Sequence, residues 1–113
     1  MAVSNGAFPV LPGKAEQARA FAKEVAGARR KEFGESQARI SATRETWSLQ
    51  STPDGDFMLV WFEAADIEKA FATLAESDEP FDVWFRQQAL EVSGVDLASD
   101  EAPPPEVLVD WKA

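Results

Sequence analysis

The order of its predicted elements places this chain in the α+β class, as one domain over residues 1–113. Two observations predict the class. Apolar and polar residues alternate around a central turn sequence, and apolar residues recur at helical spacing before and after it. The order is strand, helix, strand, strand, helix, a further helix and strand, which is the split βαβ arrangement βαββαβ with an extra helix before the last strand. We therefore expect a four-stranded antiparallel sheet with both main helices on one face.

The first strand is predicted at residues 7–11 (AFPVL), where Pro9 lacks an amide donor and argues against a fully paired central position. Pro12 and Gly13 then open a helix. If it continued to residue 39, this helix would be about 26 residues or roughly 39 Å long, which is longer than the strands that it must cover. We expect a break at Gly27 or Gly34 for this reason.

Residues 43–63 alternate around the sequence TPDGD at positions 52–56. Proline suits the second position of a turn and glycine supplies a left-handed residue, so we expect a type I turn with a bulge at Gly55 that pairs Thr52 with Asp56. In this register one face of the hairpin carries Glu45, Trp47, Leu49, Phe57, Leu59, Trp61 and Glu63. The other face carries Arg44, Thr46, Ser48, Gln50, Met58, Val60 and Phe62. A two-residue loop would shift the pairing by one residue and recombine the two sets.

The second half of the chain predicts two helices and a strand. Asp66 is suited to cap the first of these helices, and Ser77 or Asp78 ahead of Pro80 opens the second, which Gly94 ends. An acidic and triple-proline stretch at residues 98–105 predicts an extended loop. Residues 107–111 (VLVDW) after it predict the last strand.

The helix that Pro80 opens also carries two charged residues four positions apart. Asp82 and Arg86 have the spacing of an ordinary surface ion pair. The acidic residues near them, Glu76, Asp78 and Glu79, lack the spacing of a calcium loop and lie where a helix N-terminus favours acids. We expect no metal site there.

Composition excludes much of the usual chemistry of enzymes. The 113 residues include no His, Cys or Tyr, so there is no disulfide, no Ser-His-Asp triad and no histidine-ligated metal or haem. The spacing of the six glycines matches no nucleotide-binding motif. We expect no cofactor.

Charge and hydropathy limit the partners and the location. Twenty acidic residues against eleven basic ones give a net charge of −9, which would repel nucleic acids and anionic membranes. The chain shows no signal-peptide pattern and no apolar stretch of membrane-spanning length, so we expect a cytoplasmic protein.

A sheet with helices on one face leaves its other face bare. In the expected register that bare face includes Met58, Val60 and Phe62, an apolar patch larger than monomers usually expose. We expect a second copy of the chain to cover it.

Several segments of the chain resemble a known superfamily. Glu63 at the end of the hairpin, AFATLAES at residues 70–77 and the aromatic pairs that follow resemble the strand–helix–helix segment of the dimeric α+β barrel proteins, which have a ferredoxin-like fold and include cofactor-free antibiotic-biosynthesis monooxygenases. The motifs LPGK at 11–14, TPDGD at 52–56 and PFDVWF at 80–85 more closely resemble a small bacterial group of unassigned function within it. The resemblance implies a homodimeric barrel whose interior is lined by the two sheets.

One candidate ligand site follows from that resemblance. Arg44, Thr46, Ser48 and Gln50 alternate on the face that points at the barrel interior in the superfamily, beside Met58, Val60 and Phe62. These seven residues are predicted to line a pocket for a small, partly apolar molecule. The alternative is a half-solvated edge strand. The expected function is small-ligand binding or a role as an interaction module.

The alternative function is a cofactor-independent oxygenase or isomerase. Glu63 or Glu45, opposed in the expected register, would act as its carboxylate base, with Arg29 or Arg44 as electrostatic partner. The competing interpretation, which we prefer, is an ion-pair cluster in which Arg29 and Arg30 neutralise the two carboxylates.

Overall fold

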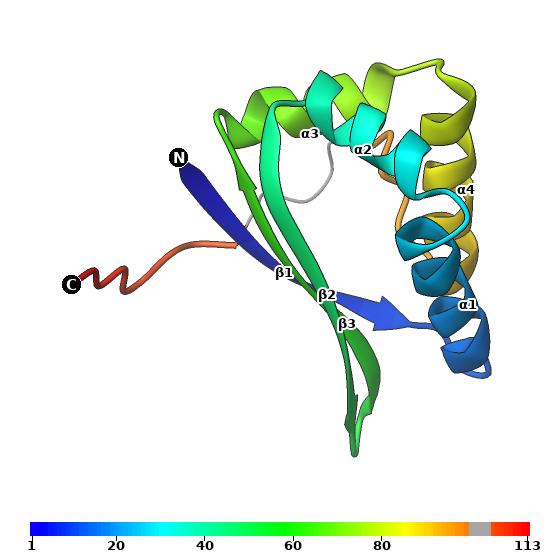
Figure 1. Ribbon diagram of the computed structural model, residues 1–113. Coiled ribbons are helices and arrows are strands. Elements are labelled where there is room, and N and C mark those ends of the chain that lie inside the picture. Colours follow the sequence, from blue (N-terminus) through cyan, green and yellow to red (C-terminus); the bar gives the residue numbers. More distant parts are fainter. Residues whose placement is uncertain (100–104) are drawn as a thin grey trace.

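Residues 1–99 and 105–113 are described by the computed structural model, and Figure 1 shows their arrangement. The α+β class is confirmed. The elements in chain order are β1 (Ala2–Val10), α1 (Ala15–Ala26), α2 (Arg30–Arg39), β2 (Ala42–Thr52), β3 (Gly55–Ala64), α3 (Ile67–Glu76) and α4 (Pro80–Ser93).

The described strands form an antiparallel sheet in the order β1-β3-β2. The four helices of the described residues lie on one side of the sheet, and no helix in that part of the chain lies over the other side, which we call the open face (Figure 1). The prediction of a fourth strand is wrong for this single chain, because residues 107–111 have no regular secondary structure and lie exposed. A strand-forming sequence becomes a strand only where a neighbouring strand completes its hydrogen bonds.

Strand β1 is longer than predicted and lies at the edge of the sheet. It pairs with β3 from Ala2, opposite Ala64, to Val10, opposite Asp56. Pro9 is compatible with this place because an edge strand leaves part of its backbone without a ladder partner.

The long helical segment is broken at Gly27, as predicted. Helix α1 ends at Ala26 and α2 begins at Arg30, whereas Gly34 lies inside α2. A side chain at Gly27 would place its Cβ 2.9 Å from the carbonyl oxygen of Lys23, so this position requires glycine.

Two of the predicted helix ends agree with the structure, but the prediction that Ser77 or Asp78 opens α4 does not, because Glu79 is the N-cap residue and its side chain makes no capping hydrogen bond. The Asp66 carboxylate accepts a hydrogen bond from the backbone N–H of Lys69 at 3.1 Å and caps α3. Helix α4 begins at Pro80, and Gly94 ends it in the left-handed conformation, at φ 70°.

The hairpin between β2 and β3 has a two-residue loop, so the expected bulged turn is wrong. Thr52 pairs with Gly55, and the Thr52 hydroxyl accepts from the backbone N–H of Asp54 and donates to the carbonyl oxygen of Gly55. Gly55 has φ 124°, a value that disfavours any residue with a Cβ. The shift by one residue moves every side chain of one strand to the opposite face relative to the other strand.

The two faces of the hairpin therefore recombine. The helix-covered face carries Glu45, Trp47 and Leu49 with Met58, Val60 and Phe62. The open face carries Arg44, Thr46, Ser48 and Gln50 with Phe57, Leu59, Trp61 and Glu63.

The core lies between the sheet and the helices. Phe62 and Ala70 belong to one buried cluster, and Val10 and Val92 to a second. Between them Phe21 contacts three aromatic rings from β2 and α4, at centroid distances of 5.1 Å to Trp47, 5.5 Å to Trp84 and 5.3 Å to Phe85. Tilted and edge-to-face pairs of this kind add to the stabilisation from burial.

Candidate functional site

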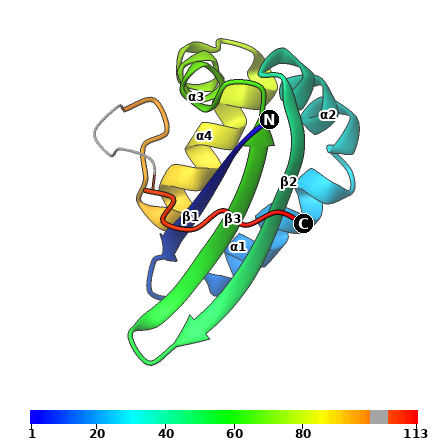
Figure 2. The same ribbon diagram turned by 90° about the vertical axis from the view of Figure 1, so that its left-hand side faces the viewer.

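The open face contains a shallow hollow of about 470 Å³ that all three strands line. Figure 2 views the molecule from this side, and the C-terminal segment crosses in front of the sheet there. The residues around the hollow are Asn5, Gly6, Ala7, Thr46, Ser48, Leu59, Val60, Trp61 and Pro105.

The floor of the hollow is aromatic and apolar, and its sides are polar. Leu59 and Trp61 are half-buried on the central strand although no helix covers them. The Arg44 guanidinium lies 5.2 Å from the centre of the Trp61 ring, within the range of a cation–π contact. The Thr46 and Ser48 side chains on β2 supply hydroxyl groups at the rim. Such a surface can stack a flat molecule and orient its polar groups by hydrogen bonds.

The structure divides the seven predicted ligand residues between the two sides of the sheet. Thr46 and Ser48 line the hollow, and Arg44 and Gln50 share their face. The side chains of the other three, Met58, Val60 and Phe62, pack on the helix-covered side, although Val60 also borders the hollow. The expected register places Leu59 and Trp61 on the opposite face from Thr46 and Ser48. Only a two-residue hairpin loop puts all four residues on the open face.

The two candidate carboxylates lie on opposite sides of the sheet, so the prediction that they face each other is wrong. Glu45 pairs with Phe62 on the helix-covered side, whereas Glu63 pairs with Arg44. Glu63 is half-buried on the open face, where the Thr43 hydroxyl donates to its carboxylate at 3.3 Å.

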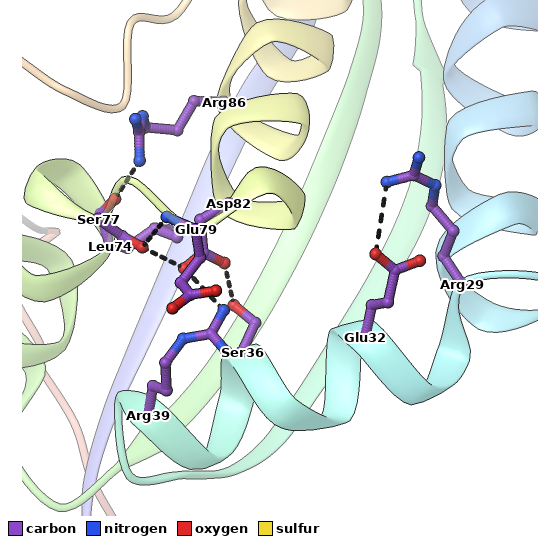
Figure 3. Close-up of polar contacts among 9 residues, drawn as sticks. All are labelled: Arg29, Glu32, Ser36, Arg39, Leu74, Ser77, Glu79, Asp82 and Arg86. Atoms are coloured by element: carbon purple, nitrogen blue, oxygen red, sulfur yellow. Dashed lines mark hydrogen bonds and ion pairs between the residues drawn. The ribbon is translucent and has the colours of Figure 1, made fainter.

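The two arginines of the predicted ion-pair cluster do not reach these carboxylates. The guanidinium of Arg29 lies 4.1 Å from the centre of the Trp84 ring and forms an ion pair with Glu24 at 3.5 Å. A second ion pair joins Arg29 to Glu32 at 4.0 Å (Figure 3). Arg30 is exposed in the first turn of α2. The cluster is therefore not formed, because the register separates its acidic members and local acids on α1 and α2 hold Arg29.

Glu45 lies between β2 and α2 with neutral hydrogen-bond donors around it. Its carboxylate accepts from Gln37 Nε2 at 3.2 Å and from Trp47 Nε1 at 2.5 Å. Burial raises the pKa of Glu45, and the hydrogen bonds from Trp47 and Gln37 offset this only in part. A raised pKa is typical of general acids and bases, but Glu45 lies across the sheet from the hollow.

Asp82 is the most deeply buried charged residue of the part of the chain that the structure describes, whereas the sequence predicts a surface residue. It is 2% exposed, and it accepts from Ser36 Oγ at 2.5 Å, Ser77 Oγ at 2.6 Å and Arg39 Nη2 at 2.9 Å (Figure 3). Burial acts to raise the pKa of Asp82, but the hydrogen bonds from Ser36, Ser77 and Arg39 and the charge of Arg39 outweigh it and hold the pKa below its ordinary value. The group ties α2 to α4 and to the loop before α4.

The predicted surface pair between Asp82 and Arg86 is wrong. Arg86 instead donates to the carbonyl oxygen of Leu74 at 2.7 Å, across the α3–α4 connection (Figure 3). Every oxygen of Asp82 has a donor, so the group has the character of a structural tie between helices.

Over residues 1–99 and 105–113, no three acidic side chains come together in a way that could hold a metal ion. None of the helices in that part of the chain is long and apolar enough to cross a membrane.

Comparison with known proteins gives one match. A family model described as "Family of unknown function (DUF6176)" matches residues 1–111. No curated protein and no solved structure matches the chain.

Proposed function

We propose that this chain, which belongs to the DUF6176 family, binds a small, partly apolar molecule on the open face of its sheet and that a second copy covers that face. The observation that carries this proposal is the hollow, whose aromatic and apolar floor lies on the side of the sheet that no helix covers. Monomeric proteins rarely leave such a surface in water without a use for it.

The charge of the open face favours the approach of a second copy. The chain has a net charge of −9, yet the open face of the hairpin carries one basic residue, Arg44, and one acidic residue, Glu63. This face is thus nearly neutral in an acidic molecule, and two such faces meet without the repulsion that other surfaces of the protein would produce.

The residues of the hollow indicate the kind of ligand. The Trp61 ring offers a flat apolar surface, Thr46 and Ser48 offer hydroxyl groups, and Asn5 offers an amide. Arg44 beside Trp61 suits an acidic or strongly polar group at the edge of the ligand. A flat molecule with an apolar body and a polar or acidic edge fits these features.

The test of binding is native mass spectrometry of the protein purified from its own host, with a search for a retained small molecule. Wild type is expected to carry one, and Trp61→Ala is expected to lose it while the protein stays folded. Phe71→Ala is the matched control, because Phe71 is an exposed aromatic residue on the helix side. Equal retention by both variants, or no retained molecule in wild type, would contradict the ligand proposal.

The test of the second copy is light scattering at micromolar concentration. A particle of twice the chain mass of 12.4 kDa is expected. A particle of the single-chain mass would contradict this part of the proposal. Leu59→Glu, which puts a charge on the open face, is expected to give folded monomers, whereas Glu68→Lys on the exposed surface of α3 leaves the particle unchanged.

A second candidate function is an oxygenase or isomerase that needs no cofactor and uses a carboxylate base. The observation that favours it is Glu63, a half-buried carboxylate on the open face beside Arg44. In this case Glu63→Gln would abolish turnover of the retained molecule and leave its binding intact, since glutamine keeps the shape but cannot take a proton. Turnover by Glu63→Gln at the wild-type rate would exclude this role.

A further inference from the structure

The last residues of the chain form an exposed apolar segment, residues 106–113, which we call the C-terminal arm. Four of its large side chains lie in solvent: Val107, Leu108, Val109 and Trp111 are 55%, 82%, 84% and 80% exposed. Proteins do not usually keep a run of this kind in water, so the arm requires a surface to cover it.

The arm has the sequence pattern of a strand. Valine and tryptophan are typical of strands, and residues 107, 109 and 111 would lie on one face with residues 108 and 110 on the other. An unpaired segment of this kind most readily adds to the free edge of a sheet, where backbone groups also lack partners.

The arm starts at the open face and leads away from its own molecule. Pro105, directly before it, lines the hollow. From there the arm runs on the side of the sheet opposite to the helices and ends well away from them (Figure 1), passing in front of the strands towards β2 when seen from the open side (Figure 2). This is the space that a second copy on the open face would occupy.

Strand β2 is the more suitable of the two free edges. It has eleven residues and contains neither proline nor glycine, whereas β1 contains Gly6 and Pro9. The arm carries Glu106, Asp110 and Lys112, and β2 carries Arg44 and Glu45, so both segments have charges of both signs and no run of like charge opposes their pairing.

We propose that the C-terminal arm of each copy adds as a fourth strand to the β2 edge of a second copy. This inference rests on the dimer of the proposed function and names the contact that holds it together. Because Thr46 and Ser48 lie on β2, the partner's arm would also border the hollow on that side.

Disulfide trapping tests the contact directly, because the chain has no cysteine of its own. Val109→Cys protein is mixed with Thr46→Cys, Ser48→Cys or Gln50→Cys protein, which together allow for different pairing registers. After mild oxidation, at least one mixture is expected to give a covalent heterodimer on a non-reducing gel. A disulfide forms only where the two Cα atoms come within about 7 Å. The controls are each variant alone and the mixture with Ala7→Cys on β1.

Two results of this experiment would overturn the proposal. The first is a covalent product with Ala7→Cys but with none of the β2 variants, which would place the arm on β1. The second is an internal disulfide within a single chain of a Val109→Cys, Ser48→Cys double variant, which would show that the arm folds back on its own sheet.

Light scattering separates failure of the arm contact from failure of the dimer. A chain that ends at Pro105 is expected to dimerise at least about tenfold more weakly than the full chain, because it lacks the fourth strand. Equal dimerisation of both chains would overturn the arm proposal and leave the dimer of the proposed function in place. A monomeric full chain would overturn both.

Discussion

The two faces of the sheet are made by alternate residues of the same strands, yet within residues 1–99 and 105–113 four helices cover one face and none covers the other. On the covered side Phe62 is 4% exposed and Trp47 packs against Phe21. On the open side Leu59 and Trp61 are half-buried beside hydroxyl groups and one arginine.

The central strand explains why the open face differs from an ordinary solvated surface. Strand β3 is apolar on both sides, with Val60 and Phe62 towards the helices and Leu59 and Trp61 away from them. The edge strand β2 alternates instead and turns polar residues outward. A strand that is apolar on both faces is typical of a sheet covered on both sides, which is why we expect an occupant for the open face.

The largest expected effect contrasts two neighbouring aromatic residues on β3. Phe62→Ala is expected to lower the free energy of unfolding by about 3–5 kcal/mol, because it leaves a cavity between the sheet and α3. Trp61→Ala, on the open face, is expected to cost the isolated chain clearly less. Urea unfolding at low protein concentration measures the free energy of unfolding of both variants. Equal losses would show that the open face is a second core of the single chain.

The next effect concerns the polar tie within the helical layer. Asp82→Ala is expected to lower the free energy of unfolding by about 3 kcal/mol, because it leaves the Arg39 charge and the Ser36 hydroxyl without their buried partner. The same measurement on Asp78→Ala, an exposed acid nearby, is expected to show little change. A loss below about 1 kcal/mol for Asp82→Ala would contradict the structural role of the tie.

Opposite pKa shifts predict opposite pH dependences for the two buried carboxylates. The pKa of Asp82 is lower in the folded state than its ordinary value of 3.8. The stabilisation that ionised Asp82 gives is therefore present above pH 3.8 and is lost as pH falls through the folded-state pKa. For Glu45, whose pKa is raised above 4.5, the folded state holds the proton more tightly. The free energy of unfolding therefore decreases as pH rises from 4.5, the ordinary pKa of the group, through the higher pKa that Glu45 has in the folded state.

Glu45→Gln tests the second of these dependences. At pH 7 it is expected to raise the free energy of unfolding by roughly 1 kcal/mol, because it removes a buried charge that has no basic partner in contact. It should also abolish the decrease in stability as pH rises above 4.5. Thermal unfolding followed across this pH range gives both quantities. A variant that is less stable than wild type at pH 7 would contradict the interpretation.

The smallest effect is expected for the carboxylate on the open face. Glu63→Gln should change the free energy of unfolding of the isolated chain by no more than about 0.5 kcal/mol, because its side-chain contact is a single long hydrogen bond from Thr43. A buried ion-pair cluster of the kind that the sequence predicts would make the same substitution cost several times more. A clear decrease in melting temperature would therefore contradict the weakly held position of Glu63 on the open face.

Features with short-range signals were predictable from the sequence. The break at Gly27, the cap at Asp66 and the helix end at Gly94 each depend on a few neighbouring residues, and each is confirmed. The same holds for the position of the hairpin turn at residues 52–55.

The hairpin register was not predictable to the required accuracy. The sequence TPDGD is compatible with loops of two or three residues, which differ little in local energy but exchange Leu59 and Trp61 for Val60 and Phe62 on the open face. Packing decides between them, because only the two-residue loop places Trp47 and Phe62 together beneath the helices. That choice also separated Glu45 from Glu63.

The sequence by itself determined the α+β class, the positions of the hairpin and of the helices before and after it, and the chemistry that missing residue types exclude, because each depends on composition or on residues a few positions apart. The tertiary structure decided which side chains share a face, since one residue of register exchanges them all. It also placed Asp82 between partners 43 and 46 positions away and left the large apolar side chains of the C-terminal arm exposed. Such contacts depend on how distant elements pack, and no local pattern encodes that packing.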